Sequence, residues 1–358
     1  MEKYLNGIKA LDKEAMKQAQ ARLDSLVKPP GSLGVLEEVA VRLAGISGQL
    51  YYDTSKRAVV IMAADNGVVA EGIASAPQSV THMQTLNFTR NVTGVSAIAK
   101  AFATDLIVVD VGVKGEIKHN EIRNRKLRMG TGNIAKEPAM SLGEAKQAVM
   151  VGIDCAIEAA NAGYSLLGAG EMGIGNTTTS AAVLCALTGA SPEKTTGKGA
   201  GLSEDAYRRK IEVIGQAIAL HKPDPADPLD VLAKVGGLDI AAMAGLYIGG
   251  AYMGVPVVID GFISTVAALA ATRLQILVKE YIFASHLSFE QGARYASESV
   301  GLRPSLHLNM RLGEGSGCPL MFAVMDAASA VIRDMGTFEE AQISDEYMEK
   351  IDEGSFLV

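Results

Sequence analysis

Short apolar runs alternate with helix-length segments along most of this chain of 358 residues. The runs are rich in Val, Ile and Leu and have the length of buried strands. Such alternation is typical of βα units whose parallel sheet is covered on both faces. It predicts strands at residues 58–63, 106–109, 164–167, 255–259, 281–284 and 305–310. We therefore expect an α/β fold with a Rossmann-like, doubly wound, mostly parallel sheet of about six strands.

The two ends of the chain have a helical pattern instead. Amphipathic helices are predicted at 5–27, 36–46 and 320–335. Pro29-Pro30-Gly31 ends the first of them, because proline cannot continue a helix. We expect the ends, 1–30 with 320–358, to form a small helical domain beside an α/β catalytic domain at 31–319.

One uncharged stretch, residues 241–259, is nearly long enough to span a membrane. It contains four glycines and Pro256, and Asp239 and Asp260 bracket it. We interpret it as a buried helix over 240–253 followed by the strand at 255–259, and we expect no membrane partner.

Polar residues beside glycine follow the predicted strands. They are Asp65, Asp110, Glu171, Asp260, Ser288 and Glu314. Asp-Gly and Asn-Gly pairs are also good turn formers, so any one of these positions has a structural explanation. Taken together they favour a ligand site, because ligands of open α/β sheets bind outside the carboxyl ends of the strands.

The segment 168–180 reads GAGEMGIGNTTTS and joins an apolar run to a helical pattern. A glycine-rich turn before a helix N-terminus is an anion site, but Glu171 in its middle indicates more than a phosphate cradle. The spacing of Gly168, Gly170 and Gly173 also fits the dinucleotide fingerprint. The acid expected about 20 residues on would be Glu193, which follows a helix instead of a strand.

A second glycine cluster, TGKGAGLS at 196–203, precedes a predicted helix at 204–220. It is either a flexible linker or a phosphate loop. Lys198 and Lys210 favour the phosphate loop, because they supply the positive charge that a phosphate needs.

Glu314 is the strongest single candidate for a catalytic residue. Gly313, Gly315 and Gly317 surround it, so that a ligand can approach the carboxylate closely. We expect a general base there; the alternative is an ordinary surface glutamate in a loop.

Composition narrows the possible partners and compartment. The net charge is −7 and no basic stripe is present, which argues against nucleic acid. The three cysteines are far apart and Cys155 and Cys185 lie in apolar helical segments, as in a reducing cytoplasm. The five histidines have no metal-ligand spacing, so we expect no metal site; His307 is expected to be buried in a strand.

Several of these motifs, in this order and spacing, resemble the nicotinate-nucleotide:dimethylbenzimidazole phosphoribosyltransferase family. The matching segments are 28–34 (KPPGSLG), 64–68 (ADNGV), 77–81 (PQSVT), 170–178 (GEMGIGNTT), 197–202 (GKGAGL) and 311–317 (RLGEGSG). They extend over nearly the whole chain.

The resemblance implies a homodimer in which a benzimidazole nitrogen attacks C1′ of nicotinate mononucleotide, releasing nicotinate and giving α-ribazole 5′-phosphate for cobalamin lower-ligand assembly. No cofactor is implied. Glu314 matches the catalytic base and Glu171 a second carboxylate. The implied nucleotide contacts are Gly173, Gly175, Asn176, Thr177, Gly199, Gly201, Lys210, Asp260 and Ser288. The implied base contacts are Pro77, Ser79, Gln84 and Leu312. An NAD-linked oxidoreductase and a non-catalytic nucleotide-binding module remain as alternatives.

Overall fold

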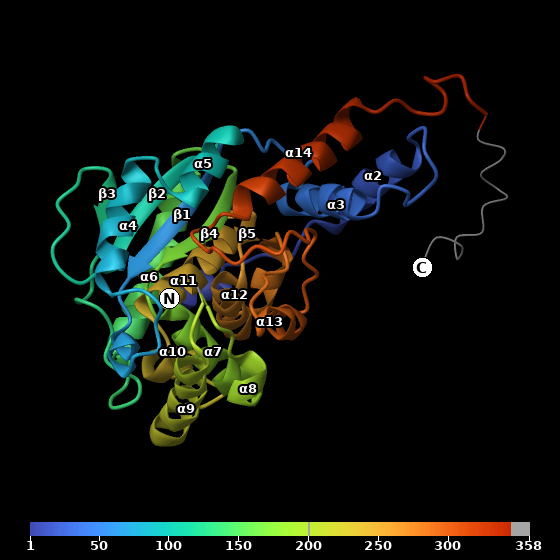
Figure 1. Cartoon of the computed structure of the whole chain (residues 1–358). Helices are drawn as coiled ribbons and strands as arrows, with labels where there is room; N and C mark the ends of the chain where they lie inside the picture. Colours follow the sequence, from blue (N-terminus) through green and yellow to red (C-terminus); the bar gives the residue numbers. More distant parts are fainter. Residues whose placement is uncertain (200, 345–358) are drawn as a thin grey trace. The chain divides into compact units, whose positions relative to one another are not determined.

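The computed structural model describes residues 1–199 and 201–344. In these ranges the chain forms a six-stranded parallel sheet, with its central strands drawn as arrows in Figure 1. The strands are β1 (Arg57–Ala64), β2 (Asp105–Gly112), β3 (Ile122–Asn124), β4 (Leu166–Met172), β5 (Val257–Ile259) and β6 (Ile282–Ala284). Their order is β3-β2-β1-β4-β5-β6, the doubly wound order whose switch point lies between β1 and β4. The predicted fold class is confirmed.

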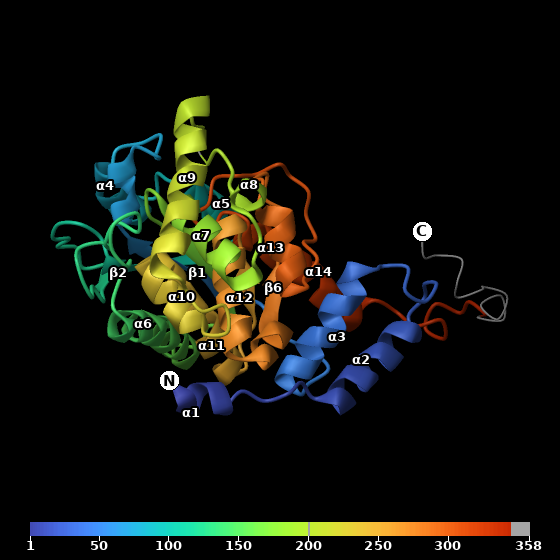
Figure 2. The same ribbon diagram turned by 90° about the horizontal axis from the view of Figure 1, so that it is seen from below.

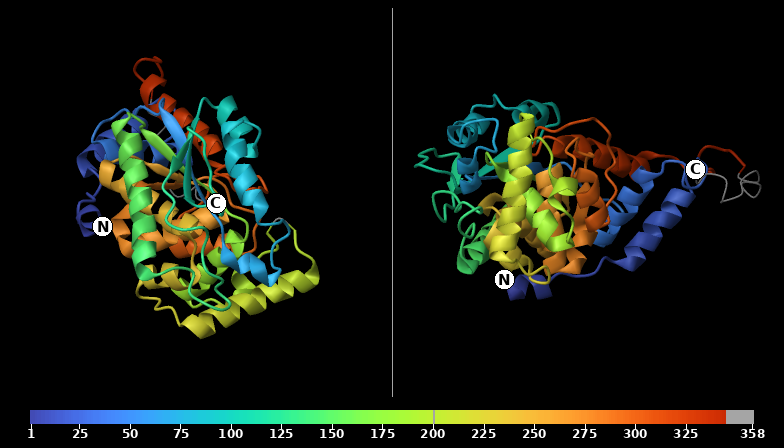
Figure 3. Two further views of the ribbon diagram at one scale, coloured as in Figure 1. Left: turned by 90° about the vertical axis from the view of Figure 1, so that its left-hand side faces the viewer. Right: turned by 60° about the horizontal axis from the view of Figure 1, so that its bottom comes forward.

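Helices cover both faces of the sheet; Figure 3 shows α4 and α6 on opposite sides of it. The early helices are α1 (Glu2–Asn6), α2 (Lys13–Asp24), α3 (Val35–Ser47), α4 (Ser79–Thr89), α5 (Gly94–Ala101) and α6 (Leu142–Asn161). The later ones are α7 (Asn176–Thr188), α8 (Pro192–Thr195), α9 (Glu204–His221), α10 (Pro228–Val235), α11 (Leu238–Met253), α12 (Phe262–Leu274), α13 (Ala293–Val300) and α14 (Cys318–Asp334). Two 3₁₀ helices occupy Gly67–Glu71 and Ile276–Tyr281.

The uncharged stretch is a core element. Helix α11 is buried from Leu238 to Ala251 and packs on α6 and on the sheet. Glycines make the close packing possible, because a Cβ on Gly245 would lie 1.9 Å from the carbonyl oxygen of Val149 in α6. The predicted helix and the strand after it are confirmed, and within the described ranges no helix is long and apolar enough to cross a membrane.

Two compact units are present. The larger contains Met1–Lys9 and Lys56–Met321, and the smaller contains Ala10–Ser55 and, within the described ranges, residues 322–344. In the smaller unit, Lys28 and Glu37 form a buried ion pair at 2.9 Å. The domain limits expected from the sequence remain a prediction, and their last residues, 345–358, lie outside the described ranges.

The prediction of a strand at 305–310 was wrong. Only Leu306 forms an isolated bridge, with His286, and the segment stays beside the end of β6 through backbone bonds such as Leu287 N to Leu306 O. Leu308 is half exposed and His307 is exposed, so the segment lacks the burial of a central strand. The sixth strand is instead β3, a short edge strand that the apolar pattern did not predict.

The boundaries of two further elements, a helix and a strand, differ from the prediction. The first helix breaks at Gly7, where a side chain would collide with the ring of Tyr252, and α2 begins only after the cap Asp12. Strand β4 continues to Met172, so Glu171 belongs to a strand and not to a loop. Glycine is used within this strand because a Cβ on Gly170 would lie 2.6 Å from the carbonyl oxygen of Glu314.

Candidate active site

A cavity of about 260 Å³ lies at the carboxyl edge of the sheet. Its wall combines the end of β4, the residues that follow β5 and β6, and the inner face of α4. The loops at 73–76 and 311–314, together with Lys198, Gly199 and Leu202, complete it. This is the edge at which open α/β sheets bind ligands.

Glu314 is held in the cavity wall by its backbone and by two hydrogen bonds. Gly313, Glu314 and Gly315 have φ values of 86°, 64° and 86°, which form a left-handed turn. Oε1 accepts a bond from Nε2 of Gln84 at 2.6 Å, and Oε2 accepts one from the backbone N–H of Val95 at 3.0 Å. The carboxylate is only 6% exposed and is fixed from two directions.

Glu171, at the end of β4, is the second carboxylate. Its Oε1 accepts the backbone N–H of Glu314 at 3.2 Å, and its Oε2 accepts a short hydrogen bond from Nδ2 of Asn176. Burial raises its pKa to about 8, and the nearby charge of Asp239 acts in the same direction. With this pKa, Glu171 is largely protonated at neutral pH.

Asp239 is a functional candidate that the sequence reasoning missed. It has no exposed surface, and its Oδ2 accepts a bond from Asn176 Nδ2 at 3.1 Å. Burial raises its pKa to about 6. In the sequence, Asp239 stands out only as the acidic residue that precedes an uncharged run. The signal that could have identified it is an acidic residue in the first turn of a helix that is otherwise apolar and buried.

Asp260, after β5, holds the turn that carries Glu314. Its Oδ2 accepts the N–H of Gly315 at 3.1 Å and its Oδ1 that of Gly317 at 2.7 Å. Burial raises its pKa to about 7. His286 Nδ1 lies 3.8 Å from Oδ1, and burial lowers the pKa of this histidine to about 4, so the ring is neutral near pH 7.

A buried lysine lies on another wall. Helix α9 packs beside α7, as Figure 2 shows, and places Lys210 beside the first turn of α7. Nζ of Lys210 is 2.9 Å from Oγ1 of Thr177 and 3.0 Å from the carbonyl oxygen of Gly197. Burial lowers its pKa to about 8. An ammonium has three donors, so one remains for a ligand next to a helix N-terminus that favours anions.

Most residues expected in the site line this cavity. They are Gln84, Glu171, Gly173, Gly175, Asn176, Thr177, Gly199, Lys210, Asp260, Ser288, Leu312 and Glu314. The structure does not bring Pro77, Ser79 and Gly201 to the wall, and all three are exposed.

The wall also contains residues that the sequence reasoning did not assign to it. They include Ile73, Val80, Phe262, His286, Glu290 and Arg311. Glu290 lies two residues after Ser288 and Arg311 begins the matched segment 311–317, but the apolar members carry no chemical signal in a sequence. Among the described residues, no group of three or more His, Cys, Asp or Glu could hold a metal ion.

The fold and this cavity define a class: an α/β protein with a site suited to group transfer on a phosphorylated substrate, with paired carboxylates on one wall and a buried lysine on another. The chain belongs to a phosphoribosyltransferase family, whose model matches residues 8–343. The family resemblance expected from the sequence is confirmed.

Relatives cover the whole chain. A nicotinate-nucleotide–dimethylbenzimidazole phosphoribosyltransferase of Clostridium perfringens is 49% identical over 100% of this chain and 99% of its own length. The enzyme of the same name from Acetivibrio thermocellus is 51% identical over 95% of this chain and 97% of its own length. The crystal structure of CobT from Thermus thermophilus matches with a TM-score of 0.89 at 44% identity, covering 92% of this chain and 99% of that one. These names do not favour the oxidoreductase alternative.

Proposed function

We propose that this protein transfers the phosphoribosyl group of nicotinate mononucleotide to a ring nitrogen of a benzimidazole, releasing nicotinate and giving α-ribazole 5′-phosphate. The observation that carries the proposal is the pair formed by Glu314 and Glu171, whose carboxylates share one cavity wall and are linked through the Glu314 N–H. The product would serve cobalamin lower-ligand assembly.

Glu314 acts as the general base. A neutral azole that attacks through one nitrogen must lose the proton on the other, and a fixed carboxylate is suited to accept it. Gln84 and Val95 hold both oxygens of Glu314 in place, which keeps the acceptor aligned with the incoming ring. Leu312 and Gln84, which both line the cavity, contact that ring, whereas Pro77 and Ser79 lie outside the cavity wall and take no part.

Glu171 acts beneath the ribose. Positive charge develops at C1′ as nicotinate leaves, and a nearby carboxylate stabilises it. Because the pKa of Glu171 is raised to about 8, a cationic nucleotide that binds beside it would favour its ionised form and displace its proton. Asn176 donates hydrogen bonds to both Glu171 and Asp239, so a change in the ionisation of one buried acid affects the other.

Lys210 binds the 5′-phosphate. One anion site is formed by the remaining N–H donor of Lys210, by Thr177 and by the N-terminus of α7. Gly173, Gly175, Gly199 and Gly201 belong to the two glycine loops on either side of it. Asp260 positions the Glu314 turn, and Ser288 lies on the adjoining wall.

The protein functions as a cytoplasmic homodimer without a cofactor, with a catalytic α/β domain and a small domain from the two ends. Nicotinate leaves from an already cationic pyridinium, so the departing group needs no added activation. Cys155, Cys185 and Cys318 are free and buried, which fits a reducing compartment. Light scattering after gel filtration measures the dimer directly.

The experiment is a reaction of the purified protein with nicotinate mononucleotide and 5,6-dimethylbenzimidazole, followed by mass spectrometry. We expect nicotinate and ribazole phosphate in equal amounts, with the α configuration by NMR. Nucleotide binding without release of nicotinate would contradict the proposal and favour a binding module.

A further inference from the structure

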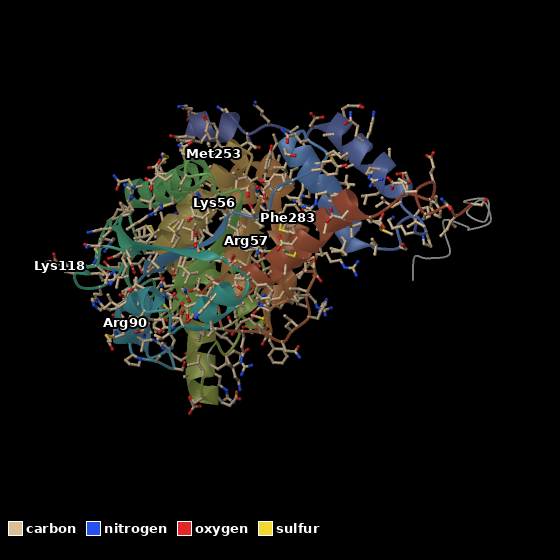
Figure 4. All side chains as sticks on the ribbon, turned by 90° about the horizontal axis from the view of Figure 1, so that it is seen from above. Lys56, Arg57, Arg90, Lys118, Met253 and Phe283 are labelled. Carbon is tan, nitrogen blue, oxygen red and sulfur yellow. The ribbon has the colours of Figure 1, made fainter. Side chains whose placement is uncertain are left out.

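Three polar side chains on one face of α4 form a line that ends at Glu314. Gln84, Asn87 and Arg90 are spaced three residues apart, which places them along one side of a helix. Arg90, labelled in Figure 4, is the exposed residue at the end of α4. Asn87 is not part of the cavity wall.

These side chains are linked by hydrogen bonds that all point the same way. Nη1 of Arg90 donates to Oδ1 of Asn87 at 3.5 Å, and Nδ2 of Asn87 donates to Oε1 of Gln84 at 3.1 Å. Nε2 of Gln84 then donates to Glu314 at 2.6 Å. The bond from Arg90 is long and exposed, so the bond between Asn87 and Gln84 is the stronger constraint.

The direction of this line matters because an amide has donors at one end and an acceptor at the other. If the Gln84 amide turned over, its carbonyl oxygen would face the carboxylate of Glu314 and repel it. The Asn87 amide group opposes that turn, because its NH₂ needs the Gln84 oxygen as acceptor.

We propose that Asn87 is a positioning residue, which holds the Gln84 amide in the orientation that donates to Glu314. The inference rests on the proposed function only in treating Glu314 as the base. Asn87 touches no substrate and acts entirely through Gln84.

The test variant is Asn87→Asp, which offers Gln84 only acceptor oxygens. The Gln84 amide then turns toward the introduced carboxylate, and Glu314 loses its donor. Losing a donor disfavours the charged carboxylate, so the acid limb of the kcat profile moves to higher pH. The base is also held less firmly, so kcat on the plateau falls about 3- to 10-fold. KM for the nucleotide stays unchanged.

Other charges must be kept constant in this comparison. Glu171 at the end of β4 and Asp260 after β5 face Glu314, and Arg90 is the charged end of the α4 line. None of them changes in the variant. Asn91→Asp adds the same charge in the exposed turn after α4 and is expected to leave the profile as in the wild type.

Two further variants separate the possible causes of a change in the kcat profile of Asn87→Asp. Asn87→Ala removes the donor without adding charge and gives a smaller shift in the same direction. In a Gln84→Leu background, Asn87→Asp should add nothing, because the two residues act through one bond. An equal shift in that background, or no shift of Asn87→Asp in the wild-type background, overturns the proposal.

A second readout does not depend on turnover. The ¹⁵N side-chain amide signal of Gln84, assigned by its loss in Gln84→Leu, should respond to a change of pH in the wild type, because this amide donates a hydrogen bond to Glu314. This response should disappear in Glu314→Gln and in Asn87→Asp. If the wild type releases no nicotinate, the proposed function fails and this measurement still decides the role of Asn87: an unchanged response in Asn87→Asp overturns it.

Discussion

The backbone N–H of Glu314 donates a hydrogen bond to Oε1 of Glu171 across 3.2 Å, joining two carboxylate residues that are 143 positions apart in the chain. The contact is possible only because Gly313 precedes Glu314, since a Cβ there would lie 2.3 Å from the same oxygen of Glu171. The separation of the two acids is thus set by a residue without a side chain.

Gly313→Ala should lower kcat by about 10- to 100-fold, because displacing the base by even 1 Å is costly for catalysis. The matched control is Gly189→Ala. Gly189 has a φ of 73°, similar to the 86° of Gly313, but open space around its Cβ position. Steady-state kinetics of both variants make the comparison. If kcat of Gly313→Ala equals that of the control, the close contact with Glu171 does not limit catalysis at this position.

The stability of the empty protein should fall as the pH rises from about 5 to 8. The pKa of Glu171 is raised to about 8 in the fold from an ordinary value of 4.5, so the native state binds more protons than the unfolded chain over this interval. The stabilisation is complete below the unfolded pKa and is lost as the pH rises through the folded one. Asp239 and Asp260, with pKa values raised to about 6 and 7, act in the same direction.

Glu171→Gln removes the largest of these contributions. Thermal unfolding of the variant should depend less on pH between 5 and 8 than that of the wild type. Glu298→Gln, an exposed change on α13, is the control and should follow the wild type. A Glu171→Gln curve parallel to the wild type would show that Glu171 is already ionised in the empty site.

Lys210→Met should raise KM for the nucleotide by roughly 10- to 100-fold, the range expected for a lost hydrogen bond to a charged group. Methionine preserves the packing of the lysine stem, and kcat should change less than KM. Arg208→Met, an exposed cation on the same helix, should leave KM nearly unchanged.

The wild-type KM should also rise above pH 8. Burial lowers the pKa of Lys210 to about 8, so its charge is lost there and not near 10.5. If KM stays level to about pH 9.5 in the wild type, the phosphate binds elsewhere.

The sequence could predict the elements whose burial is complete. Strands β1 and β2 and helix α11 are enclosed over most of their length, so their apolar residues form continuous runs. The strand ends could be predicted as well, because acids beside glycine stand out against those runs. Glu171, Asp260 and Glu314 were found in this way.

Other features depend on contacts that no local pattern encodes. Strand β3 is an edge strand with one buried residue, Ile122, and therefore has no apolar run. Strand β4 continues through Gly170 because the Glu314 backbone packs on it. Asp239 joins the site through Asn176, 63 residues away, and only the folded chain brings the two together.

The most direct test of the central claim is the turnover of Glu314→Gln with nicotinate mononucleotide and dimethylbenzimidazole. The glutamine side chain has nearly the same shape but cannot take a proton at neutral pH. We predict a loss of about 10²- to 10⁴-fold in kcat, with nucleotide affinity by calorimetry close to that of the wild type. A kcat within a few fold of the wild type would contradict the assignment of Glu314 as the base.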